Sequence, residues 1–162
     1  MSGFYRKMIV FVIPVLLIIA FIFSNSLKNS EESNKDSGVI VEVVEEIAEQ
    51  IAPNNQLNWN YIVRKSAHLF EFFVLGVCAI LFFFQLKLKA KFGILYVFTF
   101  VILIASADEF IQRFTGRTSC WEDVVIDVCG ASIGIVFVLL LSLLKKRIEQ
   151  KKKTTNPLLD KK

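Results

Sequence analysis

Four apolar runs limit what this chain can fold into. They cover about residues 8–27, 66–86, 92–111 and 124–144. A helix needs about 20 predominantly apolar residues to cross the hydrocarbon core of a bilayer. Backbone polar groups in lipid must be paired within the protein, which helices achieve internally. The runs therefore predict an all-α fold, an integral membrane bundle of four transmembrane helices.

Composition agrees with a membrane protein and excludes a large water-soluble core. Of the 162 residues, 54% are apolar and sixteen are Phe, and the mean hydropathy is +0.55. The dense basic run near the C-terminus adjoins the fourth apolar run, so nucleic acid is not an expected partner. The three cysteines have neither zinc-finger spacing nor a disulfide framework.

A cleaved signal peptide is the alternative interpretation of the first run. Arg6 and Lys7 precede it, Pro14 interrupts it, and small polar residues follow it. Both interpretations place the residues that follow outside the cytoplasm.

Charge predicts the topology. Lys and Arg gather before the first run, between the second and third, and after the fourth, whereas residues 28–61 hold seven acids and two lysines. The positive-inside rule therefore predicts a multi-pass protein with both termini cytoplasmic. The start of the second span, the end of the third and the start of the fourth then meet at one outer face. Residues 1–147 form the membrane domain, and 148–162 are predicted to be a disordered basic cytoplasmic tail.

Between the first two spans we expect a loop over residues 24–38 and then an extracytoplasmic amphipathic helix over 39–51. Ile40, Val43, Val44, Ile47 and Ile51 share one face of that helix, and glutamates occupy the rest. The helix either packs on the bundle as a connector or lies in the membrane interface and covers a site.

Ionisable residues at the outer face form the candidate site. Helical spacing places Arg64, His68 and Glu71 on one stripe, Asp108 beside Gln112, and Asp123 above Asp127 on the fourth span. We expect Glu71 and Asp127 to approach each other, with His68, Asp108 and Asp123 one layer above. Glu109 and Arg113 are expected to form an exposed pair. Gly130 and Gly134 form a small-xxx-small pattern that allows close helix packing.

Two interpretations of this cluster remain open, a self-satisfied network that fixes the helices and a functional polar pocket. The density of charge favours the pocket, since intramembrane ionisable groups are costly and usually functional. The predicted ligand-binding residues are Arg64, Lys65, His68, Glu71, Asp108, Gln112, Arg117, Asp123 and Asp127. Arg113 is a further candidate for holding an anionic group.

Several spaced motifs resemble the VanZ-like family of bacterial membrane proteins. They are Lys65-Ser66-Ala67-His68 with Glu71-Phe72, Asp108-Glu109-Phe110-Ile111-Gln112, and Gly116-Arg117 with the Asp123, Asp127, Gly130 and Gly134 series. Ser24, Ser33 and Ser37 resemble serines that the family places after its first span. Thr115 departs from the pattern, because the family commonly has Pro there. The resemblance implies a protein of the bacterial cell membrane, in a family whose namesake is associated with resistance to the antibiotic teicoplanin.

Three functions are compatible with these residues. The first is a pocket that binds the head group of a lipid or lipid-linked envelope component. The second is an interface hydrolase or transferase acting on a lipid-linked substrate, with His68, Glu71, Asp108 and Asp127 as candidates for catalysis. The third is proton-coupled lipid transport. No cofactor or metal is predicted, and a divalent metal enters only under the enzyme alternative. The sequence contains no P-loop, HExxH motif or nucleophile elbow.

Overall fold

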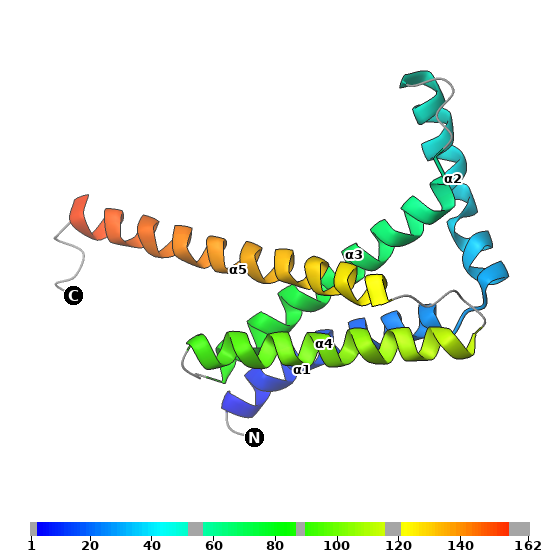
Figure 1. Cartoon of the computed structure of the whole chain (residues 1–162). Helices are drawn as coiled ribbons and strands as arrows, with labels where there is room; N and C mark the ends of the chain where they lie inside the picture. Colours follow the sequence, from blue (N-terminus) through cyan, green and yellow to red (C-terminus); the bar gives the residue numbers. More distant parts are fainter. Residues whose placement is uncertain (1–2, 52–56, 87–89, 116–120, 156–162) are drawn as a thin grey trace.

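Five helices make up almost all of the chain that this computed structural model describes, residues 3–51, 57–86, 90–115 and 121–155 (Figure 1). The helices are α1 (Gly3–Ser26), α2 (Ser30–Ile51), α3 (Trp59–Gln85), α4 (Ala90–Phe114) and α5 (Trp121–Thr155). No strand occurs within these ranges, so the predicted all-α fold is confirmed.

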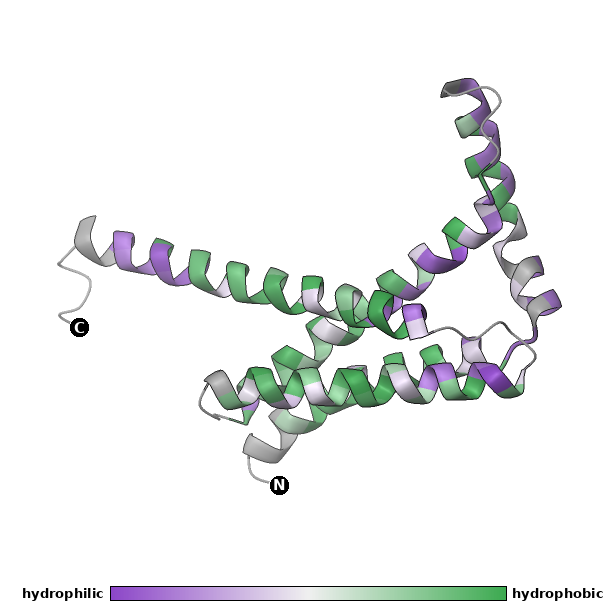
Figure 2. Ribbon diagram, in the orientation of Figure 1, coloured by the Kyte–Doolittle hydropathy of each residue, from purple (hydrophilic) through white to green (hydrophobic). Residues whose placement is uncertain are grey.

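Four of the helices are long and apolar enough to cross a membrane. The candidate spans are Met8–Ser26, Trp59–Gln85, Phe92–Phe114 and Trp121–Lys152. Figure 2 shows hydrophobic positions along the middle of α1, α3, α4 and α5 and hydrophilic positions near the end of α5. The predicted four-span arrangement is therefore confirmed. The second span begins earlier than its apolar run because the Asn58 side chain caps α3, accepting a 3.1 Å hydrogen bond from the backbone N–H of Tyr61.

The central helix is α3, which packs against each of the other four. Its inward-facing Phe72 and Leu75 are fully buried together with Val101 of α4. Val15 of α1 is also buried in this core, so α1 is a packed member of the bundle. This packing favours a membrane span over a cleaved signal peptide.

Backbones approach closely where α3 crosses α5. A Cβ added to Gly130 would overlap the backbone carbonyl of Leu69, and one added to Gly134 would overlap that of Phe73. Gly76 meets the α5 backbone in the same way from the α3 side. Only hydrogen fits at these three positions, so the glycines place α3 and α5 in direct contact.

The spans alternate in direction, so α1 begins and α5 ends on the same side of the bundle (Figure 1). On the opposite side, α1 ends, α3 begins, α4 ends and α5 begins. The Thr115 hydroxyl donates a 3.2 Å hydrogen bond to the backbone oxygen of Ser26 there, which joins the ends of α4 and α1. Helix α2 lies on this side and runs crosswise to α1 and α4.

The expected loop over residues 24–38 is wrong. Helix α1 extends to Ser26 and α2 already begins at Ser30. The cause is a capping box: the Glu32 N–H donates to Asn29 Oδ1 at 2.8 Å, and the Asn29 N–H donates to Glu32 Oε2 at 3.3 Å. This reciprocal pair satisfies two backbone donors at the helix start.

The apolar face of α2 is divided between the bundle and the exterior. Val41 is buried, and Ser33, Ser37 and Val44 are half-buried. Val39, Ile40, Val43 and Ile47 remain more than half exposed. Helix α2 therefore keeps an apolar stripe that no described part of the chain covers.

The predicted disorder of residues 148–162 is also wrong for the part that the structure describes. Helix α5 continues without a break to Thr155. Glu, Gln, Lys and Arg have high helix propensity, so a helix already formed in the span can continue beyond it. Residues 156–162 lie outside the described ranges.

Candidate functional site

Polar side chains gather on the side of the bundle where α2 lies. They form two adjoining groups. One lines a cavity between α1, α2 and α3, and the other is buried between α3, α4 and α5. His68 and Glu71 of α3 belong to both groups, because they line the cavity and face the buried acids.

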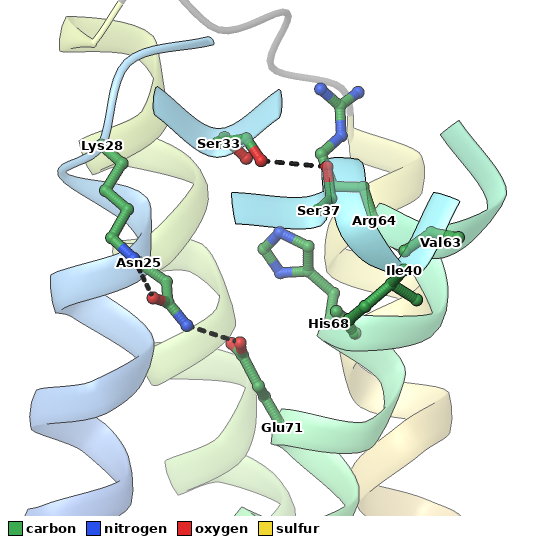
Figure 3. A pocket seen from close by; sticks show the side chains of 10 residues that line it. Asn25, Lys28, Ser33, Ser37, Ile40, Val63, Arg64, His68 and Glu71 are labelled. Carbon is green, nitrogen blue, oxygen red and sulfur yellow. Dashed lines mark hydrogen bonds between the residues drawn. The ribbon is translucent and has the colours of Figure 1, made fainter. Parts of the chain in front are cut away.

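The cavity has a volume of about 200 Å³ and a mixed polar lining. Helix α1 contributes Asn25, the turn that follows it contributes Lys28, and α2 contributes two serines. Helix α3 forms the remaining wall with Arg64, His68 and Glu71 (Figure 3). The complete lining is Asn25, Lys28, Ser33, Ser37, Ile40, Val63, Arg64, Ala67, His68 and Glu71.

A chain of hydrogen bonds runs along one wall of the cavity. Lys28 Nζ donates to Asn25 Oδ1 at 3.2 Å, and Asn25 Nδ2 donates to Glu71 Oε1 at 2.7 Å (Figure 3). These bonds orient the Glu71 carboxylate and connect it to Lys28 in the turn after α1. The Arg64 guanidinium points away from Glu71, toward the ends of the helices.

Asp108 is the most enclosed acid of the second group. Its side chain is fully buried, and it accepts hydrogen bonds from Ser26 Oγ and, at 2.7 Å, from Gln112 Nε2. These two donors hold both carboxylate oxygens in place. Gln112 is also buried. It lies four positions after Asp108 and therefore on the same face of α4.

His68 faces two aspartates from different helices. Its Nδ1 lies 3.8 Å from Asp108 Oδ2 and 3.8 Å from Asp127 Oδ1. One ligand atom from each of these three residues lies within 4.8 Å of the other two. Spans two, three and four therefore each contribute one side chain to a single point.

Asp127 is 2% exposed, and no described donor makes a hydrogen bond to its Oδ1. Glu71, Asp108 and Glu109 are close enough to repel the Asp127 carboxylate, and Lys65 is close enough to attract it. The expected approach of Glu71 and Asp127 stays a prediction, since their repulsion does not by itself establish a contact between the two side chains. His68 and Asp108 lie in the same layer as Asp127 rather than above it.

Lys65 and Asp123 are in direct contact with each other at the starts of α3 and α5. Both side chains are mostly buried, and Lys65 also lies 5.1 Å above the Tyr61 ring centroid. Neither residue lines the cavity. Their geometry fits a pair that joins two helices better than a ligand contact.

The expected exposed pair of Glu109 and Arg113 is wrong. Glu109 is only 4% exposed, whereas Arg113 is exposed. No described donor makes a hydrogen bond to either carboxylate oxygen of Glu109. Helical spacing placed Glu109 near Arg113 but did not show that the end of α4 is enclosed by its neighbours. The predicted ligand-binding residue Arg117 and the isolated Cys120 lie outside the described residues.

Sequence reasoning missed the contribution of the end of α1 and of the turn that follows it. Asn25, Ser26 and Lys28 were assigned to the end of the first span and a loop, without a role. The predicted topology could have indicated this contribution. The first span crosses the membrane once, so it ends at the outer face, where the second span begins.

These features define a polytopic helical membrane protein with a cluster of ionisable side chains enclosed at one end of its bundle. The family model described as VanZ/LLP1 matches residues 11–142 of the chain. The chain therefore belongs to the VanZ/LLP1 family, as the spaced motifs predicted. The comparisons with curated proteins and with solved structures gave no match.

Proposed function

We propose that the cavity binds the polar head group of a membrane lipid or of a lipid-linked envelope component. The observation that carries this proposal is the mixed lining of the cavity, with Lys28, Arg64, His68 and Glu71 around one space of about 200 Å³. Charged side chains at membrane depth are costly, so their convergence on a cavity indicates use.

The lining suggests how such a head group is held. Arg64 can bind a phosphate with two parallel hydrogen bonds, and Lys28 supplies a second positive charge. Glu71 and the serine hydroxyls of α2 can bind hydroxyl or amine groups. The volume suits a head group rather than a whole lipid, since pockets for drug-sized ligands measure about 300–1,000 Å³.

A second cavity supplies a place for an acyl chain. It measures about 280 Å³ and is lined only by apolar side chains of α1, α3 and α4. Ile19, which lines it, precedes Asn25 of the polar cavity by six residues, or about 9 Å along a helix. A lipid with its head group in the polar cavity can reach this apolar space with an extended chain.

Under this proposal the cavity lies at the outer face of a bacterial cell membrane, with both termini cytoplasmic. The support is the acidic character of residues 28–61 and the positive clusters at the other ends of the spans. Helix α2 lies in the interface under this proposal. Its exposed stripe of Val39, Ile40, Val43 and Ile47 contacts lipid, and its glutamates face water.

Head-group binding at this face gives a route to antibiotic resistance. A protein that sequesters or presents a lipid-linked precursor alters the cell envelope that a glycopeptide such as teicoplanin encounters. The expected result of deleting the gene is a changed susceptibility to teicoplanin that wild type restores and an Arg64→Gln variant does not.

An interface hydrolase or transferase is the second candidate. His68 with Asp108 and Asp127 in contact range favours it, because an imidazole beside carboxylates can act as a general base. Proton-coupled lipid transport is a third candidate and depends on the same buried acids. Product formation from a bound lipid distinguishes the second candidate, and movement of unmodified lipid between leaflets distinguishes the third.

The test is a lipid inventory of the purified protein by mass spectrometry. We expect an enriched lipid with a phosphate-bearing head group in wild type and its loss in Arg64→Gln. Arg147→Gln is the matched control, because it removes the same charge at the opposite end of the bundle. A lipid content that equals the bulk membrane, or equal enrichment in both variants, contradicts head-group binding.

A further inference from the structure

Buried acids of α3 and α4 gather around Asp127 of α5. The carboxylates of Glu71, Asp108 and Glu109 are close enough to repel that of Asp127. Lys65 is close enough to attract Asp127, but Lys65 is also in contact with Asp123. Asp108 and Asp127 are at least 98% buried. Buried carboxylates are stable only when they are paired, protonated or bound to a metal.

We infer that His68, Asp108 and Asp127 form a binding site for a divalent transition-metal ion, with Zn²⁺ as the best match. The three residues offer one imidazole nitrogen and two carboxylate oxygens, and their ligand atoms lie within 4.8 Å of one another. Zn²⁺ commonly binds imidazole nitrogen together with carboxylate oxygen, whereas Mg²⁺ and Ca²⁺ prefer oxygen ligands alone. A set of one imidazole and two carboxylates therefore favours Zn²⁺.

The distances admit an ion. Two ligand atoms that are each about 2.1 Å from a zinc ion can be at most about 4.2 Å apart. His68 Nδ1 lies 3.8 Å from Asp108 Oδ2 and 3.8 Å from Asp127 Oδ1, so both separations fall within that limit. All three ligand atoms lie within 4.8 Å of one another, so the Asp127 carboxylate has to move closer to Asp108 for the three to bind one ion.

An independent observation points to a ligand at the same place. Asp127 Oδ1 is buried, faces His68, and receives no hydrogen bond from the residues that the structure describes. A buried acceptor without a donor loses the hydrogen bonds it had in water. A cation beside Oδ1 replaces them.

The surroundings of Asp108 resemble the outer layer of a metal site. Ser26 Oγ donates to one oxygen of Asp108 and Gln112 Nε2 donates to the other, which fixes the orientation of the carboxylate. Partners of this kind orient metal ligands in proteins, and their loss typically costs about 10- to 100-fold in metal affinity. His68 also lines the polar cavity, so an ion held here lies next to the proposed head-group site.

The experiment is a metal titration of the full-length protein in detergent after removal of bound metal by a chelator. We expect one Zn²⁺ per chain, weaker binding of Mn²⁺ and little binding of Mg²⁺. Asp127→Asn should weaken Zn²⁺ binding by at least about tenfold. Asp123→Asn is the matched control, one turn earlier on α5 and paired with Lys65, and should bind Zn²⁺ as wild type does.

A second measurement covers variants that fold poorly. The thermal midpoint of wild type should rise when Zn²⁺ is added, because an ion that binds only the folded state stabilises it. The midpoint of His68→Gln should not respond. Wild type that neither binds Zn²⁺ nor changes its midpoint overturns the inference and indicates that protons neutralise the acids. Equal binding by wild type and Asp127→Asn overturns it as well. Neither result depends on whether a lipid co-purifies, so this inference and the head-group proposal can fail separately.

Discussion

Asn25 and Glu71 are joined by a 2.7 Å hydrogen bond between side chains that lie 46 positions apart in the sequence. The amide of Asn25 donates and the carboxylate of Glu71 accepts. The bond connects the last turn of α1 to the middle of α3, on the wall of the polar cavity. The bond therefore joins two candidate membrane spans at the cavity where the head group is proposed to bind.

Substitutions at Glu71 should separate its charge from its hydrogen bond. Glu71→Gln keeps an acceptor of the same size, so we expect the thermal midpoint to stay at the wild-type value while head-group retention falls. Glu71→Leu removes the acceptor from Asn25 and should cost about 1–3 kcal/mol of stability. Thermal unfolding in detergent and mass spectrometry of bound lipid measure the two effects. Full lipid retention by Glu71→Gln would show that the charge has no part in binding.

Ser26→Ala should destabilise the protein by about 1–3 kcal/mol, because it removes a donor from the fully buried Asp108. Ser142→Ala is the control. The Ser142 hydroxyl only bonds a carbonyl of its own helix, at 2.7 Å from Leu139 O. Its loss should change stability by less than about 0.5 kcal/mol. Equal unfolding midpoints for the two variants would contradict the role assigned to Ser26.

Gly130→Ala should separate α3 from α5, since the added methyl group overlaps the Leu69 carbonyl. Overpacking of this kind costs about 1–3 kcal/mol, and here the obstacle is backbone that cannot rotate away. Gly93→Ala in α4 meets nothing within 4 Å and should be tolerated. Unfolding midpoints of the two variants in the same detergent provide the comparison. A Gly130→Ala protein as stable as Gly93→Ala would mean that the helices do not touch at this point.

The pair of Lys65 and Asp123 should show a measurable coupling energy. A double-mutant cycle with Lys65→Met and Asp123→Asn is expected to give about 1–3 kcal/mol, because both side chains are mostly buried. The exposed pair of Lys35 and Glu31, 3.9 Å apart, is the control and should give less than about 0.5 kcal/mol. Similar coupling for both pairs would indicate that Lys65 and Asp123 are solvated.

Membrane orientation can be tested by cysteine labelling in a variant without the natural cysteines. Glu45→Cys on the exposed side of α2 should react with a membrane-impermeant maleimide in intact cells. Lys152→Cys at the exposed end of α5 should react only after permeabilisation. The opposite pattern would place the polar cavity at the cytoplasmic face.

Hydropathy was sufficient for the four spans because each span is selected by a property of about 20 successive residues, and single exceptions do not change it. Helical spacing then grouped His68 with Glu71 and Asp108 with Gln112. The structure retains both groupings, although the layer order of Asp108 and Asp127 differs. Spacing fixes which residues share a face, whereas the charge distribution predicted that spans two, three and four meet at one outer face.

The direction in which each face points was not available from spacing. Glu109 lies next to Asp108 on α4, and its burial depends on how the neighbouring helices enclose that end of α4. The prediction of a loop over residues 24–38 used composition alone and did not consider the capping box of Asn29 and Glu32. No local pattern specifies the contribution of Asn25 and Ser26 at the end of α1 and of Lys28 after it, because this contribution depends on tertiary contacts.

The position of Asp127 relative to α3 depends on three glycines. Gly76, Gly130 and Gly134 fix the register of α5 against α3 at three successive contacts. A slip of one residue would move Asp127 by about 1.5 Å along the helix and turn it by about 100° around the axis, away from His68. The glycines therefore set the rotation of one helix relative to the other, so the alignment of the buried acids in this chain depends on three positions on the contact between α3 and α5.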